Sequence, residues 1–139
     1  MIILAVDDDA EDFELFFEAV KQIDSSIIVL KASNGYEALQ LLDDHVLMPD
    51  YIFLDINMPL MDGNACLRQI KQKERLKEIP VVMYSTTNNV AEIKQYKQQG
   101  VNFLVKPHKF AQLVKSLSFI LGYTSERTDF FFIFSFPTL

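Results

Sequence analysis

The sequence predicts an α/β fold in which a doubly wound, five-stranded parallel sheet carries helices on both faces. Five short apolar runs are each followed by a segment with apolar residues at helical spacing, the alternation that produces parallel strands joined by right-handed crossovers. The third run, Tyr51 to Leu54, has no polar alternation, as expected of a strand buried on both faces. The common strand order for a sheet of this size is 2-1-3-4-5.

The apolar runs have the length and the flanking residues of strands. They are Ile2–Val6, Ile27–Leu30, Tyr51–Leu54, Val81–Tyr84 and Asn102–Val105. After the third run, Met58-Pro59 and Asp62-Gly63 mark the turn that ends the strand. Pro80 prevents the charged segment before it from continuing as a helix into the fourth strand.

Helix signals occupy the segments between and after these strands. We expect helices from Asp9 to about Ile23, from Asn34 through Leu42, from Gly63 to about Lys71, from about Asn89 to Gln99 and from about Phe110 to Ile120. Asp9 can cap the first helix, and Asn34 has an acid three residues later, which is N-cap spacing. The fourth helix has few apolar residues to bury, namely Val90, Ile93 and Tyr96, so we expect it to be loosely held.

Length and composition limit the domain organisation and the partners. With 139 residues, half of them hydrophobic, the chain fits one domain, residues 1–122, followed by a tail, residues 123–139. A net charge of −6 disfavours direct binding to nucleic acid or to an anionic membrane. Cys66 is the only cysteine, so a reducing cytoplasm is the expected location. The N-terminus lacks the features of a signal peptide, and its charges come too early for a membrane span.

Polar side chains at the carboxyl ends of four strands are expected to meet in one crevice. Asp7-Asp8 follow the first strand, and Asp55, Ser85 and Lys106 follow the third, fourth and fifth, which are neighbours in the order 2-1-3-4-5. Three carboxylates this close repel one another unless a cation neutralises them. Carboxylates without paired His or Cys fit Mg²⁺ better than Zn²⁺ or a Ca²⁺ cage. Taken singly, each of these residues could be an ordinary turn or surface residue.

The chain resembles the receiver domain of two-component response regulators, in its single-domain, chemotaxis-regulator-like form. Five separated signals carry the resemblance from residue 2 to about 121: Val6-Asp7-Asp8, Leu54-Asp55-Ile56-Asn57-Met58-Pro59 with Met61-Asp62-Gly63, Ser85, Phe103 and Lys106-Pro107. The resemblance implies a flavodoxin-like (βα)5 fold and a cytoplasmic signalling protein that is not an enzyme. Because no DNA-binding or catalytic output domain is attached, we expect a stand-alone receiver.

The resemblance also implies a phosphoacceptor and a metal site. Asp55 is implied as the carboxylate that takes a phosphoryl group from a phosphohistidine of a sensor histidine kinase or phosphotransfer protein. Asp8, Asp55 and the backbone carbonyl of Asn57 are the implied Mg²⁺ ligands, with Asp7 acting through water. Phosphoryl transfer needs mainly positioning and neutralisation of charge, which these groups can supply.

Three further residues have implied roles in binding the phosphoryl group and in switching. Lys106 is implied to pair with phosphoryl oxygens, aimed by a cis Lys106–Pro107 peptide bond. The Ser85 hydroxyl is implied to bind a phosphoryl oxygen and to move toward it, while Phe103 turns inward. Phe103 lacks the hydroxyl of the tyrosine that is frequent in the family. The implied output is a population shift that changes binding to a target protein.

Three other functions are compatible with parts of the sequence. A receiver-like domain can act as a constitutive interaction module without phosphorylation. A haloacid-dehalogenase-type phosphatase would use Asp7 as its nucleophile, but Glu11 stands where that family has a small hydroxylic residue, and the chain has no room for a cap domain. A flavodoxin-like cofactor site needs a phosphate loop rich in Ser, Thr or Gly, whereas three aspartates at this position would repel phosphate.

The tail ends in an apolar, phenylalanine-rich segment, Phe130–Leu139. It is too short to span a bilayer, and its β-propensity and lack of charge would make it an aggregation hazard if it were exposed. We therefore expect it to be covered, as an extra edge strand or a hydrophobic latch on the domain itself or on a second copy in a homodimer. A partner protein, a shallow membrane contact or a non-native origin of the segment are the alternatives.

Overall fold

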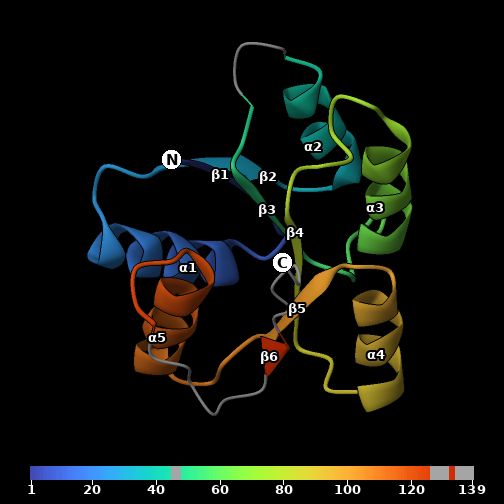
Figure 1. The fold of residues 1–139 in the computed structure, drawn as a ribbon. Helices are drawn as coiled ribbons and strands as arrows, with labels where there is room; N and C mark the ends of the chain where they lie inside the picture. Colours follow the sequence, from blue (N-terminus) through green and yellow to red (C-terminus); the bar gives the residue numbers. More distant parts are fainter. Residues whose placement is uncertain (45–47, 126–131, 134–139) are drawn as a thin grey trace.

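Five βα units and a short sixth strand form the fold (Figure 1). The computed structural model describes residues 1–44 and 48–125 and the backbone of residues 132–133. The elements are β1 (Ile2–Val6), α1 (Ala10–Ile23), β2 (Ile28–Ala32), α2 (Gly35–Leu42), β3 (Tyr51–Leu54), α3 (Gly63–Gln72), β4 (Val81–Ser85), α4 (Val90–Gln98), β5 (Asn102–Val105), α5 (Phe110–Ile120) and β6 (Phe132–Ile133). β1 to β5 are parallel in the order 2-1-3-4-5, which confirms the predicted sheet.

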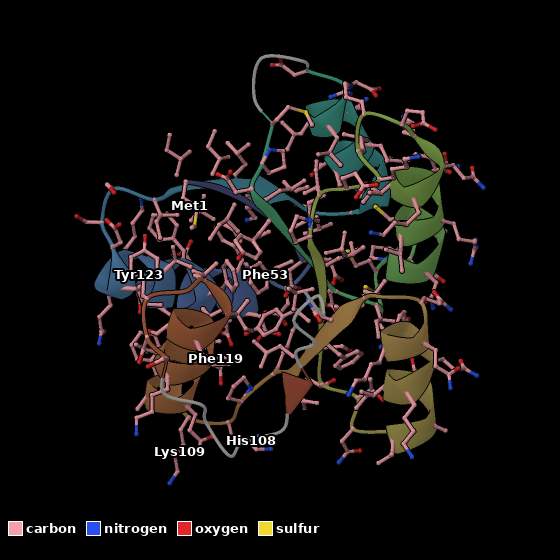
Figure 2. All side chains as sticks on the ribbon, in the orientation of Figure 1. Met1, Phe53, His108, Lys109, Phe119 and Tyr123 are labelled. Atoms are coloured by element: carbon pink, nitrogen blue, oxygen red, sulfur yellow. The ribbon has the colours of Figure 1, made fainter. Side chains whose placement is uncertain are left out.

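The helices cover the sheet in two layers, with α1 and α5 on one face and α2, α3 and α4 on the other (Figure 1). Successive residues of β3 point to opposite faces: Phe53 packs with the α1 and α5 side chains, whereas Ile52 and Leu54 pack with those of α2 and α3. Figure 2 shows Phe53 inside the first layer, and its ring centroid lies 4.9 Å from that of Phe16. Each large apolar side chain buried in this way stabilises the fold by about 1.5–3 kcal/mol.

Side-chain caps begin α1 and α2 at the residues that the sequence indicated. The Asp9 carboxylate accepts a hydrogen bond from the Asp12 N–H at 3.0 Å, and the Asn34 side chain accepts one from the Glu37 N–H at 3.0 Å. Each bond satisfies an N–H group that the first turn of a helix would otherwise leave without a partner. Because α1 and α2 start immediately after β1 and β2, these caps also place both helix N-termini at the carboxyl edge of the sheet.

The extent of β2 and the burial of Val90 differ from the prediction, and the neighbouring backbone explains both. β2 starts at Ile28 rather than Ile27 and continues to Ala32, because it pairs along the whole of β1 and the Ala32 carbonyl accepts a hydrogen bond from the Asp7 N–H at 3.0 Å. In α4, Val90 is 61% exposed, so the expectation that it is buried was wrong. Val90 is the first helical residue and follows exposed loop residues, which leaves Ile93 and Tyr96 to anchor the helix.

Two residues of the tail extend the sheet. β6 pairs antiparallel with β5, with Phe103 opposite Ile133 and Leu104 opposite Phe132. This agrees with the extra edge strand, one of the alternatives expected for the apolar segment, and it covers part of the open edge of β5. The rest of Phe130–Leu139 lies outside the described residues, and a homodimer formed through it stays a prediction. In the part of the chain that the structure describes, no helix is long and apolar enough to cross a membrane.

Removing residues 126–139 is expected to open the β5 edge. Amides of β5 that point away from β4 would then lose their partners and exchange with solvent about tenfold faster or more. Amide hydrogen exchange measures this directly, with β1 as the internal control because β2 and β3 flank it on both sides. Unchanged exchange in β5 after the truncation would contradict the pairing with β6.

Candidate functional site

The carboxyl ends of β1, β3, β4 and β5 meet at one edge of the sheet, and their hydrogen bonds hold the next residues in place. The Asp55 N–H donates to the Val6 carbonyl at 3.0 Å, which ties the end of β3 to that of β1. The Lys106 N–H donates to the Ser85 carbonyl at 2.8 Å, which ties the end of β5 to that of β4. The side chains that follow these strands therefore start from neighbouring points on the backbone.

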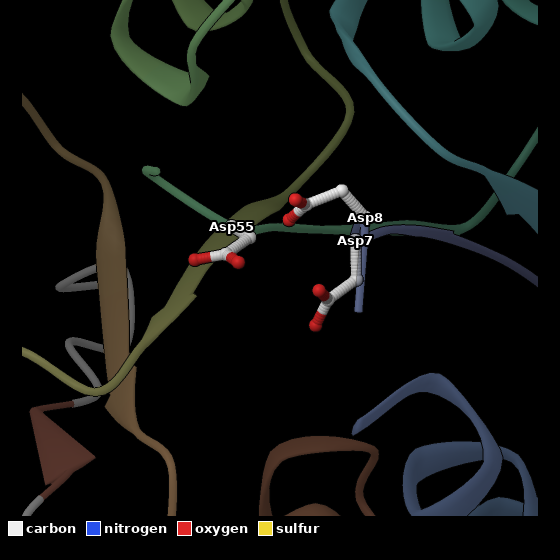
Figure 3. Close-up of side chains that lie close together, drawn as sticks. All are labelled: Asp7, Asp8 and Asp55. Atoms are coloured by element: carbon white, nitrogen blue, oxygen red, sulfur yellow. The ribbon is translucent and has the colours of Figure 1, made fainter. Parts of the chain in front are cut away.

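Three carboxylates, those of Asp7, Asp8 and Asp55, lie close together at this edge (Figure 3). Each contributes an oxygen that lies within 4.8 Å of the others. Asp7 and Asp55 are 4% and 7% exposed, whereas Asp8 is exposed. An all-oxygen donor set that is partly open to water suits a hard divalent cation, which would also relieve the repulsion between the carboxylates. Asn57, whose carbonyl is the remaining ligand implied by the resemblance, lies exposed in the loop after β3.

The Asp55 carboxylate is buried beside both positive and negative groups. Its Oδ1 accepts a hydrogen bond from the Ile56 N–H at 2.8 Å, and its Oδ2 lies 3.5 Å from the Lys106 Nζ. Burial raises the pKa of Asp55 to about 6; the Lys106 ammonium opposes this rise, and the Asp7 carboxylate adds to it. The carboxylate is therefore largely ionised at neutral pH but easier to protonate than an exposed aspartate.

The Lys106 ammonium lies between three carboxylates. Its Nζ donates to Asp12 Oδ2 at 2.8 Å and to Asp7 Oδ2 at 2.9 Å, in addition to the longer contact with Asp55. It also lies 5.1 Å from the centroid of the Tyr84 ring. Burial lowers the pKa of Lys106, but the hydrogen bonds to Asp12 and Asp7 outweigh burial and raise the pKa above its ordinary value. The side chain is therefore positively charged.

Sequence reasoning did not assign Asp12 to this site. Asp12 lies in the acidic first turn of α1, where a negative charge suits the helix dipole, and this is a sufficient reason for an acid at that position. One signal could have found it: α1 begins at the same edge of the sheet as Asp7, so a side chain in its first turn can reach a group that follows β5.

The Lys106–Pro107 peptide bond is trans, so the cis bond implied by the resemblance was wrong for this structure. The trans form of a bond before proline is favoured by about 0.5–1 kcal/mol unless the surroundings select the other isomer. From the trans backbone, the Lys106 side chain already contacts three carboxylates.

Ser85 and Phe103, the two residues implied to switch, are both 1% exposed. The Ser85 Oγ accepts a hydrogen bond from the Thr87 N–H at 3.4 Å. The Phe103 ring lies inside the core, with its centroid 5.7 Å from that of Tyr96 in α4. Phe103 thus connects β5 with α4, and the movement expected of both residues stays a prediction.

Gly63 holds the loop after β3 against the Asp55 backbone. A Cβ atom at Gly63 would overlap the Asp55 carbonyl oxygen and lie 2.8 Å from the Ile56 Cα. The Gly63 N–H donates to the Ile56 carbonyl at 2.8 Å, and Asp62 caps α3 by accepting from the Ala65 N–H at 2.8 Å. The Asp-Gly pair, expected from the sequence to form a turn, therefore also allows a close backbone approach beside Asp55.

Comparisons with known proteins agree with this geometry. Residues 3–118 match the family described as response regulator receiver domain. The response regulator Rcp1 of Synechocystis sp. is 32% identical over 133 residues, which cover 90% of this chain and 89% of Rcp1. Several other curated relatives are longer, and the chain spans about half the length of two of them.

Two solved structures share the fold over most of both chains. The crystal structure of the Mn²⁺-bound form of Rcp1 superposes with a TM-score of 0.76 at 30% identity, covering 88% of this chain and 92% of that one. The phosphorylated cyanobacterial phytochrome response regulator RcpA gives a TM-score of 0.78 at 31% identity, covering 88% and 95%. Both alignments therefore cover most of this chain at 30% identity or more.

Burial of the Asp55 charge predicts a pH-dependent stability in metal-free protein. Because the folded pKa of about 6 exceeds the ordinary 3.8, the folded state holds the proton more tightly, and stability falls as pH rises from about 4 to 7. The expected loss is about 2–3 kcal/mol. Asp55→Asn should remove it, and Glu14→Gln, on an exposed part of α1, should retain it. Urea unfolding in a chelator measures both, and parallel pH curves for Asp55→Asn and wild type would contradict the prediction.

The close approach at Gly63 predicts that Gly63→Ala disturbs the site as well as the fold. The added methyl group must displace the backbone of Asp55 and Ile56, at a cost of about 1–3 kcal/mol. Gly35→Ala is the matched control, because its methyl group meets the flexible side chain of Met61 instead. Urea unfolding and titration with a divalent cation measure stability and binding. The account fails if Gly35→Ala is the more damaging change on both measures.

Proposed function

Because the chain belongs to the response regulator receiver domain family, we propose that Asp55 accepts a phosphoryl group from a phosphohistidine and that this switches the binding of other proteins. The observation that carries the proposal is the position of the Asp55 carboxylate at the end of β3, where it lies in one acidic cluster with Asp7 and Asp8 and 3.5 Å from the Lys106 ammonium. Phosphoryl transfer needs positive charge near the nucleophile, to balance the negative oxygens of the phosphoryl group. At this position the Lys106 ammonium supplies one positive charge, and a cation in the acidic cluster would supply more.

In the proposed reaction the carboxylate acts as a nucleophile. An oxygen of Asp55 forms a bond to phosphorus as the P–N bond of the phosphohistidine breaks, and the imidazole nitrogen leaves with the electron pair and takes up a proton. The pKa of about 6 leaves most Asp55 ionised at neutral pH, which the attack requires. The Ile56 N–H orients one carboxylate oxygen. We assign the Lys106 ammonium and the Ser85 hydroxyl to the phosphoryl oxygens.

The proposal includes Mg²⁺ as the cation of the acidic cluster. Asp8, Asp55 and the backbone carbonyl of Asn57 would hold it directly, and Asp7 through water. When bound, Mg²⁺ supplies charge neutralisation for the carboxylates and the incoming phosphoryl group. The cluster of oxygens within 4.8 Å supports a hard cation, and the Mn²⁺-bound form of Rcp1 supports divalent-ion binding in such a domain.

The proposed signal passes between proteins. The phosphodonor is a sensor histidine kinase or a phosphotransfer protein, and the output is altered binding to a target protein, with Ser85 and Phe103 as the switching residues. The contact of Phe103 with Tyr96 offers a route from the site to α4, which only two buried residues anchor. Such kinases obtain their phosphoryl group from ATP. We therefore place the protein in the cytoplasm. Residues 1–122 act as the receiver, and residues 123–139 as its tail.

Labelling with a small phosphodonor tests the function. In phosphoramidate with Mg²⁺, wild-type protein should gain the mass of one phosphoryl group, and a chelator should prevent the gain. Asp55→Asn should gain none. Asp62→Asn is the matched control, because it changes a carboxylate of the same loop while an asparagine can still cap α3.

Full labelling of Asp55→Asn would refute the assignment of Asp55. A wild-type protein that takes no label, yet binds a target, would instead favour the constitutive interaction module.

A further inference from the structure

We infer that Asp12 is a positioning residue that holds the Lys106 ammonium in the resting protein and slows phosphorylation of Asp55 by competing for it. The inference rests on the proposed function of Asp55 and adds a control on its rate. In the structure, the ammonium of Lys106 contacts three carboxylates, those of Asp7, Asp12 and Asp55.

The Lys106 ammonium lies closer to the carboxylate of Asp12 than to that of Asp55. Lys106 Nζ lies 2.8 Å from Asp12 Oδ2 and 3.5 Å from Asp55 Oδ2. A lysine ammonium has three N–H donors and no more, and here three carboxylates surround it. A phosphoryl oxygen that needs one of these donors must therefore take it from a carboxylate already in contact.

Exposure shows which contact is released most easily. The side chains of Lys106 and Asp7 are 9% and 5% exposed, and that of Asp55 is 10% exposed, whereas that of Asp12 is 35% exposed. Water can replace Lys106 at Asp12, whereas a carboxylate as buried as that of Asp7 would be poorly hydrated if Lys106 left it. Asp12 is therefore the partner that Lys106 can leave and return to.

The surroundings leave room for water to reach Asp12 when Lys106 moves away from it. Asp12 and Lys106 line a groove of about 540 Å³ that is bordered by α1 and by the loops after β4 and β5. Lys106 also lies over the Tyr84 ring, whose π-face keeps the ammonium at this edge of the sheet. A short displacement of the ammonium, from Asp12 toward Asp55, is the movement that we infer.

The exchange matters at the phosphoryl-transfer step. As the bond between the Asp55 oxygen and phosphorus forms and the P–N bond of the donor breaks, the nitrogen leaves with the electron pair and takes up a proton from water. The negative charge on the phosphoryl oxygens then needs Lys106. Removing the negative charge of Asp12 weakens the interaction of Asp12 with Lys106. The ammonium is then available earlier in the reaction.

An interaction with the helix dipole is the simpler explanation for an acid at position 12. Glu11, in the same turn, provides the control for it. Glu11 and Asp12 both lie in the acidic first turn of α1, but it is Asp12 that forms an ion pair with Lys106. Glu11→Gln and Asp12→Asn remove the same charge from the same turn. Any effect of the dipole, or of net charge on the approach of an anionic donor, is therefore shared by the two variants.

Phosphorylation of Asp55 by phosphoramidate in saturating Mg²⁺, measured over a range of donor concentrations, tests the inference. Asp12→Asn should raise the limiting rate constant about threefold to tenfold, the range expected for losing a partly exposed, charge-assisted contact. Glu11→Gln should leave the limiting rate unchanged. With Lys106→Gln in place, Asp12→Asn should have no accelerating effect.

Each result gives a decision. Equal limiting rates for wild type and Asp12→Asn, or an equal gain in the Lys106→Gln background, overturn the role of Asp12 while leaving Asp55 as the phosphoacceptor. A wild-type protein that takes no phosphoryl group overturns the proposed function, and the role of Asp12 with it. Circular dichroism and urea unfolding of each variant confirm that rates are compared between folded proteins.

Discussion

The ion pairs of the Lys106 ammonium with Asp7, Asp12 and Asp55 are the interactions on which the site depends. Buried carboxylates this close together are unfavourable unless a positive charge lies among them. Lys106 can reach them because β1, β3, β4 and β5 are neighbours in the sheet, so that the residues after these strands share one edge. The parallel sheet thus brings together charges that are far apart in the sequence.

The core fixes this edge from both sides. Phe53 and Leu54, the last residues of β3, pack into opposite layers, so the backbone that leads to Asp55 is held between them. Gly63 then lets the following loop return against the Asp55 carbonyl. Tyr84 links packing with charge, because its ring belongs to the α1–α5 layer and also faces the Lys106 ammonium. The site is consequently buried at its base, at Asp7 and Asp55, and more exposed at Asp8 and Asp12.

Much of this arrangement could be predicted from the sequence, since the alternation of apolar runs and helical segments determines both the fold class and the edge where the strands end. The features that could not be predicted from the sequence depend on contacts between residues far apart along the chain. The contact of Asp12 with Lys106 depends on how α1 leaves the sheet, and the end of β2 depends on pairing with β1 rather than on the residues of β2 themselves. The choice of β5 as the edge that β6 joins, and the trans form of Lys106–Pro107, are set by tertiary context in the same way.

The account's central claim is that Asp55 is the carboxylate that forms the bond to phosphorus. Reduction of phosphorylated protein with borohydride converts an aspartyl phosphate into homoserine, so peptide mass spectrometry then identifies the modified residue. The account predicts homoserine at position 55, and no conversion in protein that was not exposed to a phosphodonor. Homoserine at Asp7 or Asp8 with position 55 unchanged would contradict it, because the nucleophile would then lie after β1 instead of after β3.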